Sequence, residues 1–130
     1  LAARAYGAKY GLEPAILAAV MLLALIGHLY PVFHGFRGGK GVATAFGVLV
    51  ALNAWVGLAL VATWLVIAVL FRYSSAAAVA AAVTAPLYVW WLVGGTPFVA
   101  VTLVMTLLLL WRHRSNVRNL LAGTEGKIGR

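Results

Sequence analysis

Apolar and polar segments alternate along this chain, and the apolar segments have the lengths of helices. Short polar stretches separate them, and a mixed, basic stretch precedes the first. In chain order the apolar segments are residues 15–33, 42–71, 76–93 and 97–111. A helix that crosses a lipid bilayer needs about 20 predominantly apolar residues. The pattern therefore predicts an all-α protein whose helices cross a membrane.

The segment 42–71 is too long for one crossing. As a single helix it would extend about 45 Å, against a hydrocarbon core of about 30 Å. Because Asn53 and Gly57 interrupt it, we predict a short helix over 42–52 and a full one over 54–71. The chain is then a single polytopic, integral membrane domain with about five transmembrane helices, one of them short.

The positions of the basic residues support this division. With five helices, most of the basic residues fall on one side of the membrane, and only Arg4 and Lys9 lie elsewhere. The residues on the common side are Arg37, Lys40, Arg72, Arg112, Arg114, Arg118, Lys127 and Arg130. Since basic residues concentrate in cytoplasmic loops, we expect the glycine-rich loop, the 72–75 turn and the C-terminal tail to face the cytoplasm.

The composition agrees with a membrane protein and narrows its partners. Hydrophobic residues make up 65% of the chain and charged residues 9%, whereas soluble domains average about 25% charged. The net charge of +8 suits anionic lipid or an anionic substrate. Five Trp residues and the lack of a polar domain argue against nucleic acid. The absence of cysteine excludes disulfides, thiol catalysis and Cys-ligated metal.

A glycine-rich basic loop precedes the short helix. Successive glycines let backbone N–H groups converge on one anion, and a helix N-terminus adds partial positive charge. We expect Gly38, Gly39, Lys40 and Gly41 to bind a phosphate, with the Thr44 hydroxyl as a further donor. The spacing is not that of a Walker A motif. The alternative is a tight turn whose lysine extends to the membrane surface.

A second polar cluster covers residues 112–125. His113 is suited to proton transfer near neutral pH, Asn116 can orient a hydroxyl or carbonyl group, and Arg118 can bind phosphate through two hydrogen bonds. Glu125 is better suited to pairing with an arginine than to acting as a base. The alternative is a basic interfacial helix attracted to anionic lipid.

His28 and the 72–75 turn give weaker signals. An ionisable residue inside a span is usually functional or paired, so His28 is either near a site or a neutral side chain satisfied by a neighbouring helix. Arg72 is expected at the membrane interface and Ser74 at a helix start. The histidines and carboxylates lack the spacing of metal ligands, so we expect no metal.

Three motifs in order resemble those of the bacterial acyl-phosphate:glycerol-3-phosphate acyltransferases. The segment from Gly27 to Thr44, GHLYPVFHGFRGGKGVAT, is similar to the second motif of that family. Arg72-Tyr73-Ser74-Ser75 recurs in the expected place, and Arg112-His113-Arg114-Ser115-Asn116 with Gly123-Thr124-Glu125 is similar to the third motif. The resemblance covers essentially the whole chain. The family's first two helices and first motif have no counterpart, so the chain resembles the C-terminal part of the enzyme.

The resemblance implies transfer of a fatty acyl group from acyl-phosphate to the 1-hydroxyl of glycerol 3-phosphate. The product is lysophosphatidate, in phospholipid synthesis at the bacterial inner membrane, and no cofactor is needed. It also implies that the glycine loop with Lys40 holds the glycerol 3-phosphate group, that His113 and Asn116 line the reaction centre, and that Glu125 is mainly structural.

Three points stay open at the level of sequence. An acyl-phosphate is a mixed anhydride with a good leaving group, so either His113 or a phosphate oxygen of the donor could accept the hydroxyl proton. Acyl-chain preference and oligomeric state are not determined. A membrane anion carrier and a non-catalytic membrane subunit are the alternatives to an enzyme; a carrier would favour charged residues along a path through the bilayer.

Overall fold

The computed structural model describes residues 8–35 and 38–129, and these are helical with short connections. The helices are α2 (Pro14–Leu29), the short 3₁₀ helix η1 (Val32–His34), α3 (Val42–Leu52), α4 (Ala54–Phe71), α5 (Ser74–Leu92), α6 (Thr96–Arg112) and α7 (Arg114–Ala122). No strand occurs in these two ranges, and the predicted all-α fold is confirmed. Three of the basic residues used above to predict the sides of the membrane lie outside the described residues: Arg4, Arg37 and Arg130.

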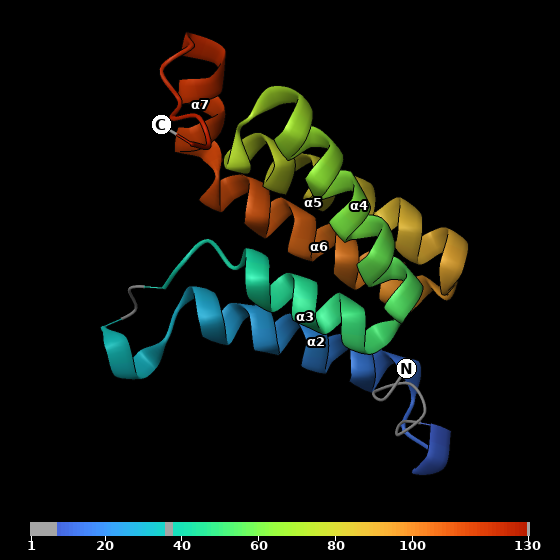
Figure 1. Cartoon of the computed structure of the whole chain (residues 1–130). Helices are drawn as coiled ribbons and strands as arrows, with labels where there is room; N and C mark the ends of the chain where they lie inside the picture. Colours follow the sequence, from blue (N-terminus) through green and yellow to red (C-terminus); the bar gives the residue numbers. More distant parts are fainter. Residues whose placement is uncertain (1–7, 36–37, 130) are drawn as a thin grey trace.

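The helices pack as a bundle in which chain neighbours are also spatial neighbours. Helix α5 contacts α4 and α6, α6 also contacts α2, and α3 packs on α4 (Figure 1). The glycine-rich loop, the start of α5 and the bend into α7 lie at one end of the bundle (Figure 1). The start of α2 and the turns at Asn53 and at 94–95 lie at the other end. The polar segments are therefore grouped as the charge pattern led us to expect.

Asn53 separates α3 from α4 at the predicted position. Its backbone is extended (φ −159°, ψ 123°), and its side-chain Oδ1 accepts hydrogen bonds from Trp55 N at 2.8 Å and Val56 N at 3.4 Å. This caps N–H groups at the start of α4 that lack helical partners. Gly57 then lets α3 pack closely, since a Cβ there would overlap Val50. The bounds 42–52 and 54–71 match the two helices.

The five predicted helices are present, and they differ in how well their lengths suit a membrane. Among the described residues, three segments are long and apolar enough to cross one: Pro14–His34, Ala54–Phe71 and Ser74–Leu92. Helices α6 and α7, bent by 58° relative to each other, are a fourth candidate if the pair is taken as one span. Helix α3, with 11 residues, extends only about 16 Å, roughly half the hydrocarbon core.

Two helix ends differ from the predicted bounds for local reasons. Helix α2 ends at Leu29 rather than 33, because the residue before a proline is disfavoured in helical conformation and Tyr30 precedes Pro31. Helix α5 begins at Ser74, two residues earlier than expected. Ser75 thereby becomes part of the helix and is buried.

We expect Asn53→Ala to destabilise the protein by about 1 kcal/mol, because the start of α4 loses its only side-chain cap. Asn53→Asp is the control, since a carboxylate oxygen can accept the same two bonds. The measurement is unfolding of the detergent-solubilised variants by heat or denaturant. Equal stability of the Ala and Asp variants would show that Asn53 does not stabilise the break.

Candidate functional site

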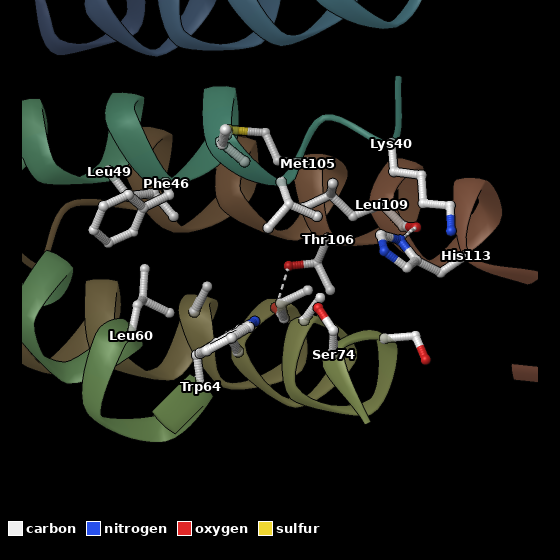
Figure 2. Close-up of a pocket in the computed structure, with 18 of the residues that line it drawn as sticks. Lys40, Phe46, Leu49, Leu60, Trp64, Ser74, Met105, Thr106, Leu109 and His113 are labelled. Atoms are coloured by element: carbon white, nitrogen blue, oxygen red, sulfur yellow. Dashed lines mark hydrogen bonds between the residues drawn. The ribbon is translucent and has the colours of Figure 1, made fainter. Parts of the chain in front are cut away.

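A cavity of about 620 Å³ lies among α3, α4, α5 and α6, with polar groups at one end. Figure 2 shows Lys40 and His113 at that end and Phe46, Leu49 and Leu60 toward the other. The apolar walls include Val61, Trp64, Leu65, Ala78, Ala81, Ala82, Ala85, Met105 and Leu109. The cavity is thus a long apolar space that ends in a small group of polar side chains.

The two threonine hydroxyl groups in the cavity walls are already hydrogen-bonded to helix carbonyls. Thr102 Oγ1 donates to Phe98 O, and Thr106 Oγ1 donates to Ala82 O, each at 2.7 Å. A threonine whose hydroxyl is hydrogen-bonded to a carbonyl presents mainly its methyl group to the cavity. It therefore adds little polarity to the wall. The middle of the cavity therefore suits a hydrocarbon chain rather than a polar ligand.

A chain of hydrogen bonds joins the polar segments at the open end. Lys40 Nζ donates to Asn116 Oδ1 at 2.6 Å, and Asn116 Nδ2 donates to Glu125 Oε1 at 2.7 Å. The same carboxylate oxygen accepts from Ser75 Oγ at 2.6 Å. The four residues come from the glycine-rich loop, α7, the tail and the start of α5. The tertiary structure thus brings four segments of the chain into one site.

The C-terminal tail is fixed to the 72–75 turn by a second pair of bonds. Ile128 N donates to Arg72 O at 2.6 Å, and Arg72 Nη2 donates to Ile128 O at 2.9 Å. Arg72 has a left-handed backbone (φ 60°) at the end of α4, a conformation that costs a non-glycine residue free energy. The two bonds to the tail help to hold it there.

The pKa of the Glu125 carboxyl is lowered from its ordinary value of 4.5. The hydrogen bond from Ser75 is the largest cause, followed by the bond from Asn116, while partial burial opposes the shift. Asn119 and the positive charge of Lys40 lower it further. Glu125 is therefore an ionised acceptor at neutral pH and organises its neighbours rather than serving as a proton acceptor.

His113 is buried at the end of α6 and borders the cavity. Its Nδ1 lies 2.8 Å from Leu109 O (Figure 2). Because a carbonyl oxygen can only accept, Nδ1 carries the proton, and a neutral ring then leaves Nε2 with a free lone pair. The ring is thereby held in the tautomer that a general base requires.

The glycine-rich loop packs against the end of α2 and leaves no room for a side chain at Gly38 or Gly41. A Cβ on Gly38 would overlap the carbonyl oxygens of His28 and Leu29. Gly41 has φ 80°, and a Cβ there would meet Leu25 at 2.8 Å and Leu29 at 2.9 Å. Gly41 also begins α3 without a side-chain cap, so the first N–H groups of α3 are available to an anion.

Besides the three loop glycines, three of the predicted site residues do not line the cavity. Thr44 is half-buried on α3, Arg118 is exposed on α7, and His28 is exposed on the last turn of α2. His28 does lie beside the loop, since its Nε2 would be 3.2 Å from a Cβ on Gly39. Roles for these three side chains stay predictions.

The contacts of Arg112 and of Glu125 were not foreseen from the sequence. Arg112 had no assigned role beyond its charge and its place in the third motif, yet it hydrogen-bonds the carbonyl oxygens of Gly38 and Gly39. Its position next to His113 at the end of an apolar segment was the available signal. Ser75 is 50 positions from Glu125, and no local pattern indicates that contact.

We expect the Glu125 carboxylate to stabilise the folded protein at neutral pH and to lose this contribution in acid. Because its pKa is lower in the folded protein than the ordinary 4.5, its contribution is complete above about pH 4.5 and is lost as the pH falls through the folded-state value. The difference in unfolding temperature between wild type and Glu125→Gln should therefore be constant near neutral pH and vanish in acid. Glu13→Gln, at the other end of the bundle, controls for the loss of one negative charge. A difference that persists unchanged at low pH would contradict this role.

Comparison with known proteins identifies relatives of this chain. The family model described as glycerol-3-phosphate acyltransferase matches residues 1–123. Proteins with that name are similar in sequence: one from Thioalkalivibrio sulfidiphilus is 55% identical over 92% of this chain and 59% of its own length. Another, from Thiobacillus denitrificans, is 49% identical over 100% of this chain and 65% of its own length. The chain thus spans about three fifths of the length of these relatives.

Two crystal structures share the fold. Both are of PlsY (YgiH), an integral membrane glycerol 3-phosphate acyltransferase. The glycerol 3-phosphate form has a TM-score of 0.90 and 36% identity over 98% of this chain and 64% of that one. The lysophosphatidic acid form has a TM-score of 0.79 and 34% identity over 97% of this chain and 76% of that one. The chain is accordingly a multi-pass membrane protein, and it belongs to the glycerol-3-phosphate acyltransferase family.

Proposed function

We propose that this chain forms the phosphate site and acyl-chain cavity of an enzyme that acylates glycerol 3-phosphate. The acyl donor is a fatty acyl-phosphate, the acceptor is the 1-hydroxyl, and the products are lysophosphatidate and phosphate. The reaction takes place at the cytoplasmic face of the bacterial inner membrane. One observation carries the proposal: the apolar cavity ends at Lys40, His113 and Asn116.

The two halves of the cavity fit the two parts of an acyl-phosphate. Its apolar walls suit the fatty chain, because burying apolar surface is favourable at about 25 cal/mol per Å². The charged head of that molecule would sit at the polar end, beside Lys40 and the loop proposed to hold the phosphate of glycerol 3-phosphate. A lysine ammonium has three donors, so Lys40 can keep its bond to Asn116 and still donate two bonds to phosphate oxygens.

His113 is the proton acceptor in the proposed step. The hydroxyl oxygen of glycerol 3-phosphate attacks the acyl carbonyl carbon, and the proton moves to His113 Nε2. The bond between the carbonyl carbon and the phosphate oxygen then breaks, and phosphate leaves with the electron pair. The free lone pair on Nε2, fixed by the bond from Nδ1 to Leu109 O, favours His113 over a phosphate oxygen of the donor.

The anion carrier has less support than the enzyme. A carrier places charged groups along a path through the bilayer. Within the described residues, the charged side chains that line the cavity are Lys40 and Glu125, both at its polar end. The apolar remainder would oppose the passage of an anion.

We expect Lys40→Ala to weaken glycerol 3-phosphate binding roughly 10- to 100-fold, because bonds to a charged group are worth about 1.5–3 kcal/mol. Acyl transfer should fall at least as much. Lys9→Ala is the control, since it removes a lysine near the opposite end of the bundle. The assays are calorimetric binding and transfer from palmitoyl-phosphate to radiolabelled glycerol 3-phosphate. Absence of both binding and transfer in the wild-type chain would overturn the proposal.

A graded series on α5 tests the acyl-chain cavity. Ala78, Ala82 and Ala85 line it at increasing distance from the polar end, over about 10 Å of helix. Replacing each in turn with Leu should lower kcat/KM for long-chain acyl-phosphates, and the longest donor still accepted should increase from position 78 to 85. Ala80→Leu, outside the cavity lining, is the control. An equal loss for donors of every length would contradict an acyl chain in this cavity.

A further inference from the structure

Arg112 connects the end of α6 to the glycine-rich loop. Its Nη2 donates to Gly38 O at 2.7 Å and to Gly39 O at 2.9 Å, and its Nε donates to Gly39 O at 3.2 Å. The guanidinium also lies 5.9 Å from the ring centroid of Tyr30. The contacts join residues more than 70 positions apart in the sequence. Arg112 does not line the cavity, so the proposed mechanism leaves it without a role.

The direction of these bonds determines where the loop N–H groups point. The peptide bonds here are trans, and in a planar trans unit the C=O of one residue and the N–H of the next point in opposite directions. Since the carbonyls of Gly38 and Gly39 face Arg112, the N–H groups of Gly39 and Lys40 face away from it. Among the described residues these two N–H groups have no hydrogen-bond partner.

The loop needs such an external constraint because of its composition. Glycine occupies positive and negative φ about equally readily, so peptide units flanked by glycines can rotate at low cost. A guanidinium offers five N–H donors in a rigid, planar fork and can bond two carbonyls at once. A lysine ammonium has no such planar geometry.

We propose that Arg112 is a positioning residue for phosphate binding. By binding the carbonyls of Gly38 and Gly39 it holds the N–H groups of Gly39 and Lys40 toward the phosphate of glycerol 3-phosphate. It acts through the loop and does not touch the substrate. The inference rests on the proposed function for the identity of the anion, and on the loop geometry alone for the orientation of the amides.

Arg114 provides a matched control on the same stretch of chain. Its guanidinium lies 4.4 Å from the Trp111 ring centroid, and Nη1 donates to Trp111 O at 2.9 Å. None of its contacts reaches the described part of the loop. Arg114→Gln therefore removes a positive charge of the same kind, two residues away, without releasing the loop carbonyls.

The binding experiment compares Arg112→Gln, Arg112→Lys and Arg114→Gln in the detergent-solubilised chain. We expect the Kd for glycerol 3-phosphate, measured by calorimetry, to rise about tenfold in R112Q, which corresponds to about 1.4 kcal/mol. R112K should recover only a minor part of this loss, and R114Q should match the wild type. In transfer assays R112Q should raise KM for glycerol 3-phosphate and leave kcat and the KM for acyl-phosphate within about twofold.

A second measurement tests the orientation without any ligand. Backbone order parameters of Gly39 and Lys40, from ¹⁵N relaxation, should fall in R112Q and stay at the wild-type value in R114Q. Unchanged order parameters in R112Q would overturn the inference, and so would full recovery of affinity in R112K, which would assign the effect to charge alone. If the order parameters fall but the wild-type chain does not bind glycerol 3-phosphate, the proposed function fails and the role of Arg112 in ordering the loop remains.

Discussion

The polar end of this protein depends on one carboxylate. Glu125 accepts hydrogen bonds from Ser75 and Asn116 through the same oxygen, and Asn116 in turn accepts from Lys40. Without that acceptor, the start of α5 would share no side-chain bond with α7 at this point, and only the bond from Lys40 to Asn116 would remain between α7 and the glycine-rich loop. Chains of hydrogen bonds strengthen one another when every member is satisfied. The described part of the chain contains no buried side-chain polar atom without a partner, so this condition holds.

A second set of contacts decides what the glycine-rich loop can do. Gly38 and Gly41 let the loop lie against the end of α2, where any side chain would clash. Arg112, at the end of α6, binds the loop carbonyls. The backbone is therefore held by contacts to both α2 and α6, its N–H groups face away from Arg112, and the loop leads into the uncapped start of α3. Backbone N–H groups cannot be reoriented by a change of side-chain rotamer. An anion site made mainly of such groups therefore needs a backbone that is held in place.

The cavity and the polar end are linked by the bend between α6 and α7. The 58° change of direction occurs at His113, which places its ring at the boundary between apolar walls and charged groups. Apolar side chains of α6 line the cavity as far as Leu109, and α7 places Asn116 at its polar end. An apolar space that ends in charged groups suits a molecule with a hydrocarbon chain and a charged head. The solved relatives, in their glycerol 3-phosphate and lysophosphatidic acid forms, share the fold.

The sequence by itself determined the helices and the grouping of the polar segments. In a membrane, every backbone polar group must be satisfied within the protein, so long apolar segments form helices and polar residues gather at their ends. Helix length required a break within 42–71, and the interruption at Asn53 and Gly57 indicated where. The motifs also indicated Lys40, His113 and Asn116, which the structure brings together at one end of the cavity.

Only the tertiary structure decided how those residues act. The tautomer of His113 depends on a carbonyl one turn earlier, and the ionised state of Glu125 depends on Ser75, 50 positions away. The direction of the loop amides depends on Arg112, more than 70 positions away. Sequence patterns report local geometry and burial, whereas hydrogen bonds between distant segments depend on how the helices pack. For this reason the sequence identified Lys40, His113 and Asn116, whereas the packing added Ser75 and Arg112 and determined how the side chains and backbone groups of the site are oriented.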